Sequence, residues 1–451
     1  MSKKNLKISV SGVRGIVGEA LTPALVTSFA AAFGQYVGHG RVIVGRDTRI
    51  TGDMYERAVI AGLLSVGCQP VLIGVVPTPT VQMVVEEYNA NGGIAITASH
   101  NPIEWNALKL IGRSGVFLTQ CEAKELLDIY NQPHRNYACE EEFRNIRKLE
   151  NMFTIHEDKI FENINVDLVK GRKLRVAVDC CNGAGAPYAV GFLEKLGCEV
   201  LAIHTTVDGT FHRRPEPVPE NLTALSQAVI ENRCDIGFAQ DPDADRIVVV
   251  DEFGEPIGEQ NSIVLATEHL LSQQSGKVVV NIQTTKSVAD IAEKYGSECI
   301  YTPVGEINVT SRMLKEQAVI GGEGGSGGII FPQVHPCRDS FTGMALILEL
   351  LAVRGQSLRT ILNGLPLYAS SGAKVSISSE NALKMIRALI RKYKDEQVSK
   401  IDGLRIDWPD AWVLIRSSNT EPIVRVYAEA KDSQKADELA VKFIKEIEEY
   451  V

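Results

Sequence analysis

Three aspartates stand at every second position in the stretch Ile236–Gly–Phe–Ala–Gln–Asp–Pro–Asp–Ala–Asp–Arg–Ile247. Asp241, Asp243 and Asp245 follow an apolar run typical of a strand, which places them in the loop after it. In a straight strand alternate residues stand about 6.6 Å apart, too far to share one small ion, so the loop must curl at Pro242. Such carboxylates repel one another and offer hard oxygen ligands, which predicts a Mg²⁺ or Ca²⁺ site. The alternative is a solvated acidic turn. An EF-hand loop begins with the same spacing, but the later glycine and glutamate of that pattern are missing from this sequence.

A serine loop follows the apolar run in Ile94–Ala–Ile–Thr–Ala–Ser–His–Asn–Pro102. An Asn–Pro step resists helix, so Ser99 and His100 are predicted to lie on a turn at the carboxyl end of a strand. Open α/β sheets bind ligands at that edge, where a hydroxyl is well placed for phosphoryl transfer. The alternative is a turn whose Ser and Asn only satisfy local hydrogen bonds.

A glycine-rich loop, Gly321–Gly–Glu–Gly–Gly–Ser–Gly–Gly328, holds one carboxylate and one hydroxyl. It lacks the Gly–Lys–Ser/Thr ending of a nucleotide P-loop. Glycine permits a close backbone approach, and Glu323 can accept hydrogen bonds from neighbouring sugar hydroxyls. A flexible linker is the alternative interpretation.

The stretch Arg416–Ser–Ser–Asn–Thr–Glu–Pro422, followed by Arg425, gathers a guanidinium, three hydroxyls and an amide between two predicted strands. Arg binds phosphate oxygens in a fork, and hydroxyl and backbone N–H groups fill the remaining acceptors. The pattern predicts a phosphate clamp, although a polar hairpin loop has the same composition.

The elements that must position these loops recur three times along the chain. Val- and Ile-rich runs followed by helical periodicity occur at Arg41–Asp47, Leu174–Asn182 and Lys277–Ile282. Such runs are typical of parallel strands covered on both faces by helices. We therefore expect three α/β units in series.

The remaining tail, Ser370 to Val451, is predicted to form a strand, a helix, three short strands and a last helix, Ser433 to Tyr450. This order indicates a smaller α+β domain. Charged sequence between the first two units and glycine- and proline-containing turns further on mark the domain limits. We predict domains at residues 1–150, 151–255, 256–367 and 368–451.

Composition bounds the class of protein. The chain has 451 residues, 45% hydrophobic and 23% charged, which is typical of a folded multidomain protein. A net charge of −9 without a basic tract argues against nucleic acid as partner. Met1 to Lys7 is short and polar, and no apolar run approaches the roughly 18 residues of a membrane span. We expect a cytoplasmic protein, monomer or homodimer, that meets no membrane.

Taken together and in this order, the four loops resemble those of the α-D-phosphohexomutase family. The resemblance implies three consecutive α/β domains plus a smaller C-terminal α+β domain around a central cleft. It implies that Ser99 carries a phosphoryl group and that Asp241, Asp243 and Asp245 bind Mg²⁺ together with a phosphoserine oxygen. A phosphoserine beside three carboxylates needs a dication and nearby cations on physical grounds as well.

The same resemblance assigns roles to further residues. Lys109, in Trp105–Asn–Ala–Leu–Lys109, is similar to the family's general acid/base. Arg14 and Arg246 would neutralise phosphate charge. Two roles for His100 stay open, a donor to the phosphoserine or a support of the loop. The substrate would be held by sugar-binding and phosphate-binding side chains: Glu323, Ser326, Arg416, Ser418, Asn419, Thr420 and Arg425. His335 is either a substrate contact or a surface residue.

The implied reaction exchanges hexose 6-phosphate and hexose 1-phosphate through a 1,6-bisphosphate, which also serves as activator. The segment ending at Lys109 and the glycine-rich loop are most similar to a divergent phosphoglucosamine mutase branch. The loop differs from the Glu–x–Ser–Gly–His of typical bacterial members, so phosphomannomutase or phosphoglucomutase stays an alternative. Two other classes remain, a phosphatase with an aspartyl-phosphate at Asp241 and a sugar-phosphate sensor without catalysis.

Overall fold

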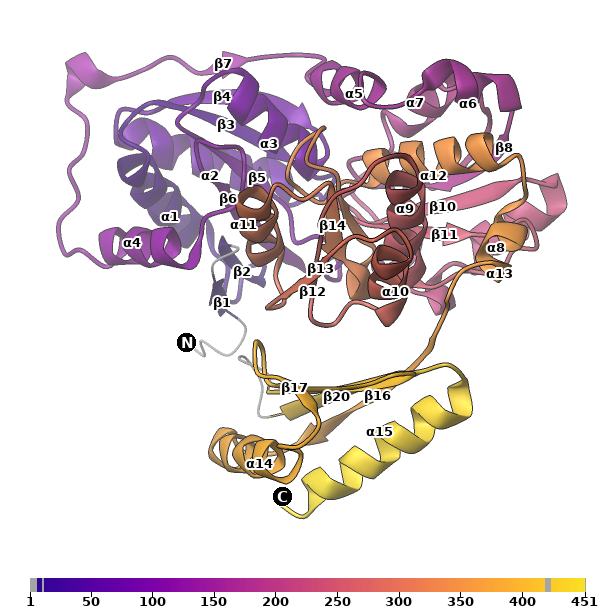
Figure 1. Ribbon diagram of the computed structural model, residues 1–451. Helices are drawn as coiled ribbons and strands as arrows, with labels where there is room; N and C mark the ends of the chain where they lie inside the picture. Colours follow the sequence, from indigo (N-terminus) through magenta and orange to yellow (C-terminus); the bar gives the residue numbers. More distant parts are fainter. Residues whose placement is uncertain (1–5, 10–11, 418–422, 451) are drawn as a thin grey trace.

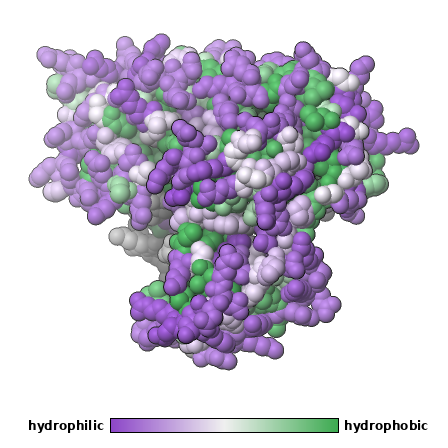
Figure 2. All heavy atoms as spheres, viewed as in Figure 1, coloured by the Kyte–Doolittle hydropathy of each residue, from purple (hydrophilic) through white to green (hydrophobic). Residues whose placement is uncertain are grey.

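The chain folds into four domains in sequence order, each built on its own β-sheet (Figure 1). The structure is a computed structural model that describes residues 6–9, 12–417 and 423–450. Domains I to III each pack helices against a sheet, and domain IV lies below them in the view of Figure 1. Figure 2 shows the surface of domain IV in contact with the rest of the molecule. Among the described helices, none has the length and apolar character needed to cross a lipid bilayer.

Domain I is a mixed sheet with helices on both faces. Alternate residues of its central strand point to opposite faces, so Val42 and Val44 pack in one apolar cluster with α1 and α2, whereas Ile43 packs in another with α3. The strands, in spatial order, are β1 (Leu6–Ser9), β2 (Gly12–Ile16), β6 (Trp105–Ile111), β5 (Gly92–Ile96), β3 (Arg41–Arg46), β4 (Gln69–Val75) and β7 (Arg147–Lys148). The helices are α1 (Pro23–Tyr36), α2 (Gly52–Ser65), α3 (Thr78–Glu87) and α4 (Gln120–Tyr130).

Domain II has a four-stranded sheet in which β8 pairs in parallel with β9 and β10, while β11 is antiparallel. The spatial order is β11 (Ile247–Val250), β10 (Ile236–Gln240), β8 (Arg175–Asp179) and β9 (Glu199–Ile203). Its helices are α5 (Phe153–Phe161), α6 (Val166–Arg172), α7 (Ala189–Lys195) and α8 (Thr223–Asn232).

Domain III repeats this plan, since β12 pairs in parallel with β13 and β14, and β15 is antiparallel. The spatial order is β13 (Cys299–Thr302), β12 (Val278–Asn281), β14 (Ile320–Glu323) and β15 (Gly328–Ile330). Its helices are α9 (Glu259–Gln273), α10 (Lys286–Lys294), α11 (Glu306–Glu316), α12 (Ser340–Arg354) and α13 (Leu358–Asn363). The three predicted Val- and Ile-rich runs are thus β3, β8 and β12, and their parallel pairing is confirmed.

Domains II and III share one hydrophobic core. Phe341 of α12 lies with its ring centroid 4.8 Å from that of Phe153 in α5 and 5.2 Å from that of Phe192 in α7. A core that crosses the domain boundary couples the two sheets mechanically, because neither half buries its apolar face alone. The loop of domain II that carries Asp241, Asp243 and Asp245 (the metal loop) and the glycine-rich loop of domain III, Gly321 to Gly328 (the sugar loop), are therefore held in a fixed relation.

Domain IV is an α+β unit, as predicted, but it has one strand more than the sequence indicated. Among the described residues, four strands lie between its helices instead of the predicted three. The sequence did not indicate β17 because this strand is only three residues long and has little apolar pattern. The spatial order is β16 (Ala369–Ser376), β20 (Ile423–Ala430), β19 (Ala411–Ser417), β18 (Leu404–Trp408) and β17 (Gln397–Ser399), with helices α14 (Ser379–Lys392) and α15 (Ser433–Glu448).

A buried arginine joins domain IV to domain III. The guanidinium of Arg405 lies between the rings of Tyr301 and Trp412, with centroid distances of 4.6 and 4.3 Å. It also donates to the backbone oxygen of Ile282 at 2.6 Å and pairs with Asp407 at 2.9 Å. The charge is thus paired and stacked at the interface, which fixes how domain IV docks. The predicted domain limits, cytoplasmic location and oligomeric state stay predictions.

Candidate active site

Ser99 lies on a strained turn directly beside the first metal-loop aspartate. Its loop follows β5, and its φ of +50° is in the left-handed region that non-glycine residues rarely adopt. The Ser99 hydroxyl donates to Oδ2 of Asp241 at 2.7 Å, although the two residues are 142 positions apart. The predicted turn at a strand end is confirmed, and it brings the nucleophile candidate to the acidic loop.

Arg49, which the sequence analysis did not select, holds the serine loop in place. Its fully buried guanidinium pairs with Asp47 at 3.0 Å and donates to the backbone oxygens of Ser99 and Asn101, both at 2.7 Å. A charged group in this setting is stabilised by several hydrogen bonds, which restrict the loop to one conformation. Arg49 follows β3 at the same sheet edge as Ser99, so the strand-end argument could have indicated it.

The three aspartates converge as the curl of their loop requires. Their ligand oxygens lie within 4.8 Å of one another, and all three side chains are buried. The left-handed residue that bends the loop is Ala244, with φ +55°, rather than Pro242. Oδ1 of Asp243 and Oδ1 of Asp245 are buried without a hydrogen-bond partner. Buried carboxylate oxygens without a hydrogen-bond donor, in a cluster whose ligand atoms lie this close together, fit a hard cation, so the three aspartates can hold a metal ion.

Burial and mutual repulsion raise the pKa of one aspartate of this group, whereas nearby cations lower the pKa of another. Desolvation and the neighbouring Asp243 and Asp245 raise the pKa of Asp241 well above its ordinary value. Burial also opposes ionisation of Asp245, but Arg338, Lys109 and Arg246 outweigh it and lower the pKa of that carboxyl. The loop therefore holds more negative charge than its burial supports, and the surrounding cations compensate for it.

Lys109 is the nearest of these cations. Its Nζ lies 2.6 Å from Oδ2 of Asp243 and 2.9 Å from Oδ2 of Asp245. Burial lowers the pKa of Lys109, but the two aspartates more than reverse this and the net shift is upward. Lys109 stands on β6, so domain I contributes a positive charge to the domain II loop. Its role as a general acid/base stays a prediction.

Arg14 and Arg246 complete a positive rim around Ser99. Arg246 Nε lies 4.0 Å from Asp241 and 3.7 Å from Asp245, and Arg14 donates to Oδ1 of Asn101 at 2.6 Å. Both arginines line the same cavity as Ser99. A rim of guanidinium groups is suited to binding phosphate oxygens.

His100 lines the cavity too, with Nδ1 3.5 Å from the Ser99 hydroxyl. Burial, together with Arg246 and Arg14, holds its pKa well below the ordinary value for histidine. A neutral imidazole can donate from one nitrogen only. The two roles left open for His100 both stay open.

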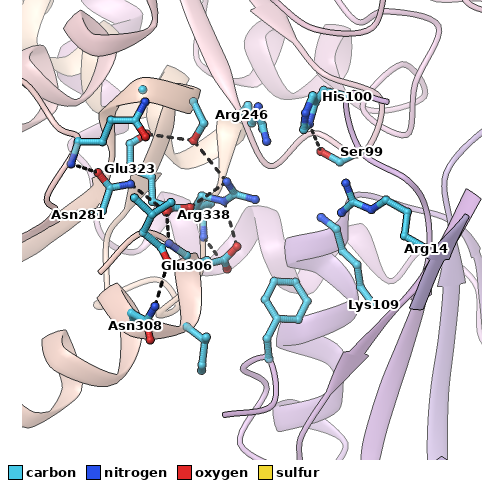
Figure 3. A pocket seen from close by; sticks show the side chains of 17 residues that line it. Arg14, Ser99, His100, Lys109, Arg246, Asn281, Glu306, Asn308, Glu323 and Arg338 are labelled. Carbon is cyan, nitrogen blue, oxygen red and sulfur yellow. Dashed lines mark hydrogen bonds and ion pairs between the residues drawn. The ribbon is translucent and has the colours of Figure 1, made fainter. Parts of the chain in front are cut away.

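The cavity itself has a volume of about 280 Å³ and lies between domains I, II and III (Figure 3). Glu323, at the end of β14, and Ser326, in the short turn after it, line the cavity, and Figure 3 shows Glu323 across the cavity from Ser99. A Cβ at Gly327 would lie 2.4 Å from the backbone oxygen of Ile247, so this glycine permits a close approach between domains. The flexible-linker interpretation of the loop is therefore wrong.

Two further charged residues, Glu306 and Arg338, line the cavity and were missed by the sequence analysis. Burial raises the pKa of Glu306 to about 7, against the opposing effect of Arg338. Arg338 immediately precedes Asp339, the N-cap of α12, and Glu306 begins α11 after β13. Glu306 follows β13 at the sheet edge that carries Glu323, and this position was the available signal. Arg338 follows the antiparallel strand β15 and returns to this edge through a bridge to Ile330, so no strand-end position indicated it.

The predicted phosphate clamp stands on neighbouring strands of domain IV. Arg416 on β19 is in register with Arg425 on β20, and Arg416 Nε lies 2.8 Å from Asp402. The structure does not bring either arginine into the lining of the cavity around Ser99. Three clamp residues, Ser418, Asn419 and Thr420, lie outside the described residues.

His335 is not a surface residue, because its side chain is 1% exposed. Its ring nitrogens lie 3.1 Å from Oε2 of Glu86 and 3.0 Å from the backbone oxygen of Gly115. It joins domain III to domain I and is not among the residues that line the cavity. Its place between two elements distant in the chain gave no local signal.

Comparison with known proteins assigns the chain and its fold to one class. Four sequence profiles match in order, described as phosphoglucomutase/phosphomannomutase alpha/beta/alpha domains I, II and III and C-terminal domain, over residues 5–136, 155–254, 259–368 and 374–446. The chain is 36% identical over 439 residues, 96% of each chain, to a protein of Methanopyrus kandleri described as a probable phosphoglucosamine mutase. It is also 36% identical over 446 residues, 97% of each chain, to a phosphoglucomutase/phosphomannomutase of Thermococcus kodakarensis.

Among solved structures, a phosphoglucomutase/phosphomannomutase family protein from Burkholderia thailandensis superimposes with a TM-score of 0.83 at 27% identity, covering 98% of both chains. The domain order, the acidic loop beside a buried serine and the shared cavity define a phosphohexomutase, an isomerase that transfers a phosphoryl group within a sugar phosphate. The chain belongs to the phosphoglucomutase/phosphomannomutase family.

Proposed function

We propose that this phosphohexomutase interconverts glucosamine 6-phosphate and glucosamine 1-phosphate through a phosphorylated Ser99. The observation that carries the mechanism is the 2.7 Å contact between the Ser99 hydroxyl and Asp241, inside a cavity rimmed by Lys109, Arg14 and Arg246. A phosphoserine there faces cations on one side and a metal-binding loop on the other. Phosphoryl transfer demands chiefly such positioning and charge stabilisation.

The proposed cycle begins with phospho-Ser99. The 1-hydroxyl of glucosamine 6-phosphate accepts the phosphoryl group, which forms the 1,6-bisphosphate and frees the Ser99 hydroxyl. The bisphosphate turns end for end inside the cleft. Ser99 then accepts the 6-phosphoryl group, which leaves glucosamine 1-phosphate and restores phospho-Ser99. A hexose 1,6-bisphosphate acts as activator because it can phosphorylate an enzyme that has lost its phosphate.

The chain's own residues divide the chemical work. Lys109 serves as the general acid/base: its ammonium group donates a proton to the Ser99 oxygen as that oxygen leaves the phosphoryl group, and recovers a proton from the attacking hydroxyl. Arg14 and Arg246 neutralise the transferred phosphoryl group. Mg²⁺, held by Asp241 and its two partners together with a phosphoserine oxygen, supplies further neutralisation of phosphate charge when bound.

The sugar and the second phosphate are held on the far side of the cavity. Glu323 and Ser326 accept and donate hydrogen bonds to sugar hydroxyls, and the domain IV loop with Arg416 and Arg425 grips the phosphate that is not reacting. Because the clamp arginines do not line the cavity, domain IV closes on the bound substrate. This closure lets one clamp recognise either phosphate during the turn.

Two features favour an amino sugar. Relatives that match over nearly the whole chain are named phosphoglucosamine mutases. The sugar side of the cavity also carries two carboxylates, Glu306 and Glu323, against one guanidinium, Arg338, which complements a protonated amine. The second candidate, exchange of mannose or glucose phosphates, is favoured by the name of the Thermococcus relative.

The testing experiment combines Ser99→Ala with a substrate comparison. The wild-type protein, with Mg²⁺ and a trace of the matching 1,6-bisphosphate, is expected to show its highest kcat/KM with glucosamine 6-phosphate. Ser99→Ala is expected to abolish turnover and phosphoserine formation. Ser65→Ala should keep both, because Ser65 lies outside the cavity lining and its hydroxyl donates to the backbone oxygen of Gly62 in its own helix. Full activity of Ser99→Ala, or phosphate found on Asp241, would overturn the mechanism in favour of an aspartyl-phosphate enzyme. Binding without any turnover by the wild type would indicate a sensor.

A further inference from the structure

One arginine on the sugar side of the cavity contacts three carboxylates from three different segments. Arg338 Nη2 lies 2.7 Å from Oδ2 of Asp245, Nε lies 2.9 Å from Oε2 of Glu306, and Nη1 lies 3.1 Å from Oε2 of Glu323. Its side chain is only 10% exposed. Each guanidinium nitrogen thus pairs with a different carboxylate, and water screens these charges weakly because the side chain is buried.

The charges in the cavity are unevenly distributed. Figure 3 places Arg14, Lys109, Ser99 and His100 on one side and Glu323 with Asn281 on the other, with Arg338 between them. Lys109 is paired with Asp243 and Asp245 on the phosphate side. Arg338 is therefore the cation that directly faces the two sugar-side carboxylates among the described residues that line the cavity.

Glu323 is largely occupied before any sugar binds. Its Oε1 accepts hydrogen bonds from Nδ2 of Asn281 at 2.9 Å and from the backbone N–H of Gly305 at 2.7 Å, and its Oε2 accepts from Arg338. A carboxylate has about four acceptor sites, so about one remains for a sugar group. How strongly the remaining acceptor site of Glu323 binds a sugar group depends on how much of the carboxylate charge Arg338 neutralises.

We propose that Arg338 is a specificity-determining residue that sets how strongly the sugar site prefers a cationic amino group over a hydroxyl. Arg338 offsets part of the negative charge of Glu306 and Glu323 on the sugar side. Without it the sugar side becomes more negative and its attraction for an ammonium group increases, whereas a neutral hydroxyl gains little. This inference rests on the proposed function, because it assumes that a hexose phosphate occupies the cavity.

The test compares glucosamine 6-phosphate with glucose 6-phosphate, which differ only in the group at carbon 2. Dissociation constants are measured calorimetrically at pH 7.5 for the wild type, Arg338→Gln, Arg338→Lys and Glu306→Gln. We expect Arg338→Gln to raise the preference for the amino sugar at least tenfold, about 1.4 kcal/mol. Arg338→Lys keeps the charge and should stay within about threefold of the wild type, and Glu306→Gln should lower the preference.

A control separates specificity from loss of structure. Arg405→Gln also removes a buried, paired arginine, but at the interface of domains III and IV, and should leave the preference unchanged. A purely structural role of Arg338 would weaken binding of both sugar phosphates equally. An unmoved ratio in Arg338→Gln therefore overturns the inference and leaves the proposed function standing. If Arg338→Gln does not fold, the opposite shift in Glu306→Gln decides, and its absence overturns the inference. A wild type that binds neither sugar phosphate overturns both.

Discussion

Lys109→Met is a substitution whose effect the structure allows us to work out in some detail. The Lys109 side chain is 4% exposed, and those of Asp243 and Asp245 are each 1% exposed. At an effective dielectric constant of about 20, each contact corresponds to a gross attraction of about 6 kcal/mol. Desolvation cancels much of this, and removal of one partner from a buried ion pair costs about 3–5 kcal/mol in practice. We therefore expect Lys109→Met to lower the free energy of unfolding of the metal-free protein by about 3–5 kcal/mol.

A divalent cation should reverse much of this loss. The three aspartates face Lys109, Arg246 and Arg338, so removal of Lys109 makes the loop more negative. The added charge strengthens binding of Mg²⁺, and each tenfold gain in affinity stabilises the folded state by a further 1.4 kcal/mol or so. The variant should therefore show a larger Mg²⁺-induced rise in Tm than the wild type, while its mutase activity falls.

The assay is calorimetric unfolding in chelator and across a Mg²⁺ titration. Lys384→Met is the matched control, because Lys384 Nζ lies 2.7 Å from Glu380 but both side chains are exposed. Such a surface pair contributes roughly 0.5 kcal/mol, so this variant should unfold like the wild type. An unchanged Tm of metal-free Lys109→Met, or an equal Mg²⁺ shift in variant and wild type, would refute the electrostatic reasoning.

Two further predictions concern the domain interfaces. The hydrogen bond from His335 lowers the pKa of Glu86 from 4.5 to about 2. The ionised Glu86 carboxylate therefore stabilises the folded protein above pH 4.5, and this stabilisation is lost as the pH falls through about 2. The urea midpoint of Glu86→Gln should accordingly lie below that of the wild type at pH 6 and approach it near pH 2, and a gap independent of pH would contradict this. Arg405→Met removes the hydrogen bond to Ile282 and the contacts with two aromatic rings, at a cost of about 3 kcal/mol to domain docking. Limited proteolysis should cleave residues 364–368, the segment between α13 of domain III and β16 of domain IV, faster in this variant. An unchanged rate would show that the docking does not depend on Arg405.

The sequence by itself determined the features that depend on neighbouring residues. Val- and Ile-rich runs specify β3, β8 and β12, because a strand covered on both faces needs apolar residues throughout. The same pattern places Ser99 and the aspartates at strand ends, and the order of four loops indicates the family. The missed strand β17 shows the limit of this approach, since three residues carry too little periodicity.

Tertiary structure alone decided which groups meet. Ser99 and Asp241 are 142 residues apart, and Lys109 reaches Asp245 across 136 residues. Arg338 joins the sugar loop to the metal loop because domains II and III share a core that holds their strand ends together. No local pattern encodes such contacts, since each charge is favourable at its buried position only when its distant partner is also there. The sequence therefore determined the kinds of groups in the site, and the packing of the domains determined their pairing.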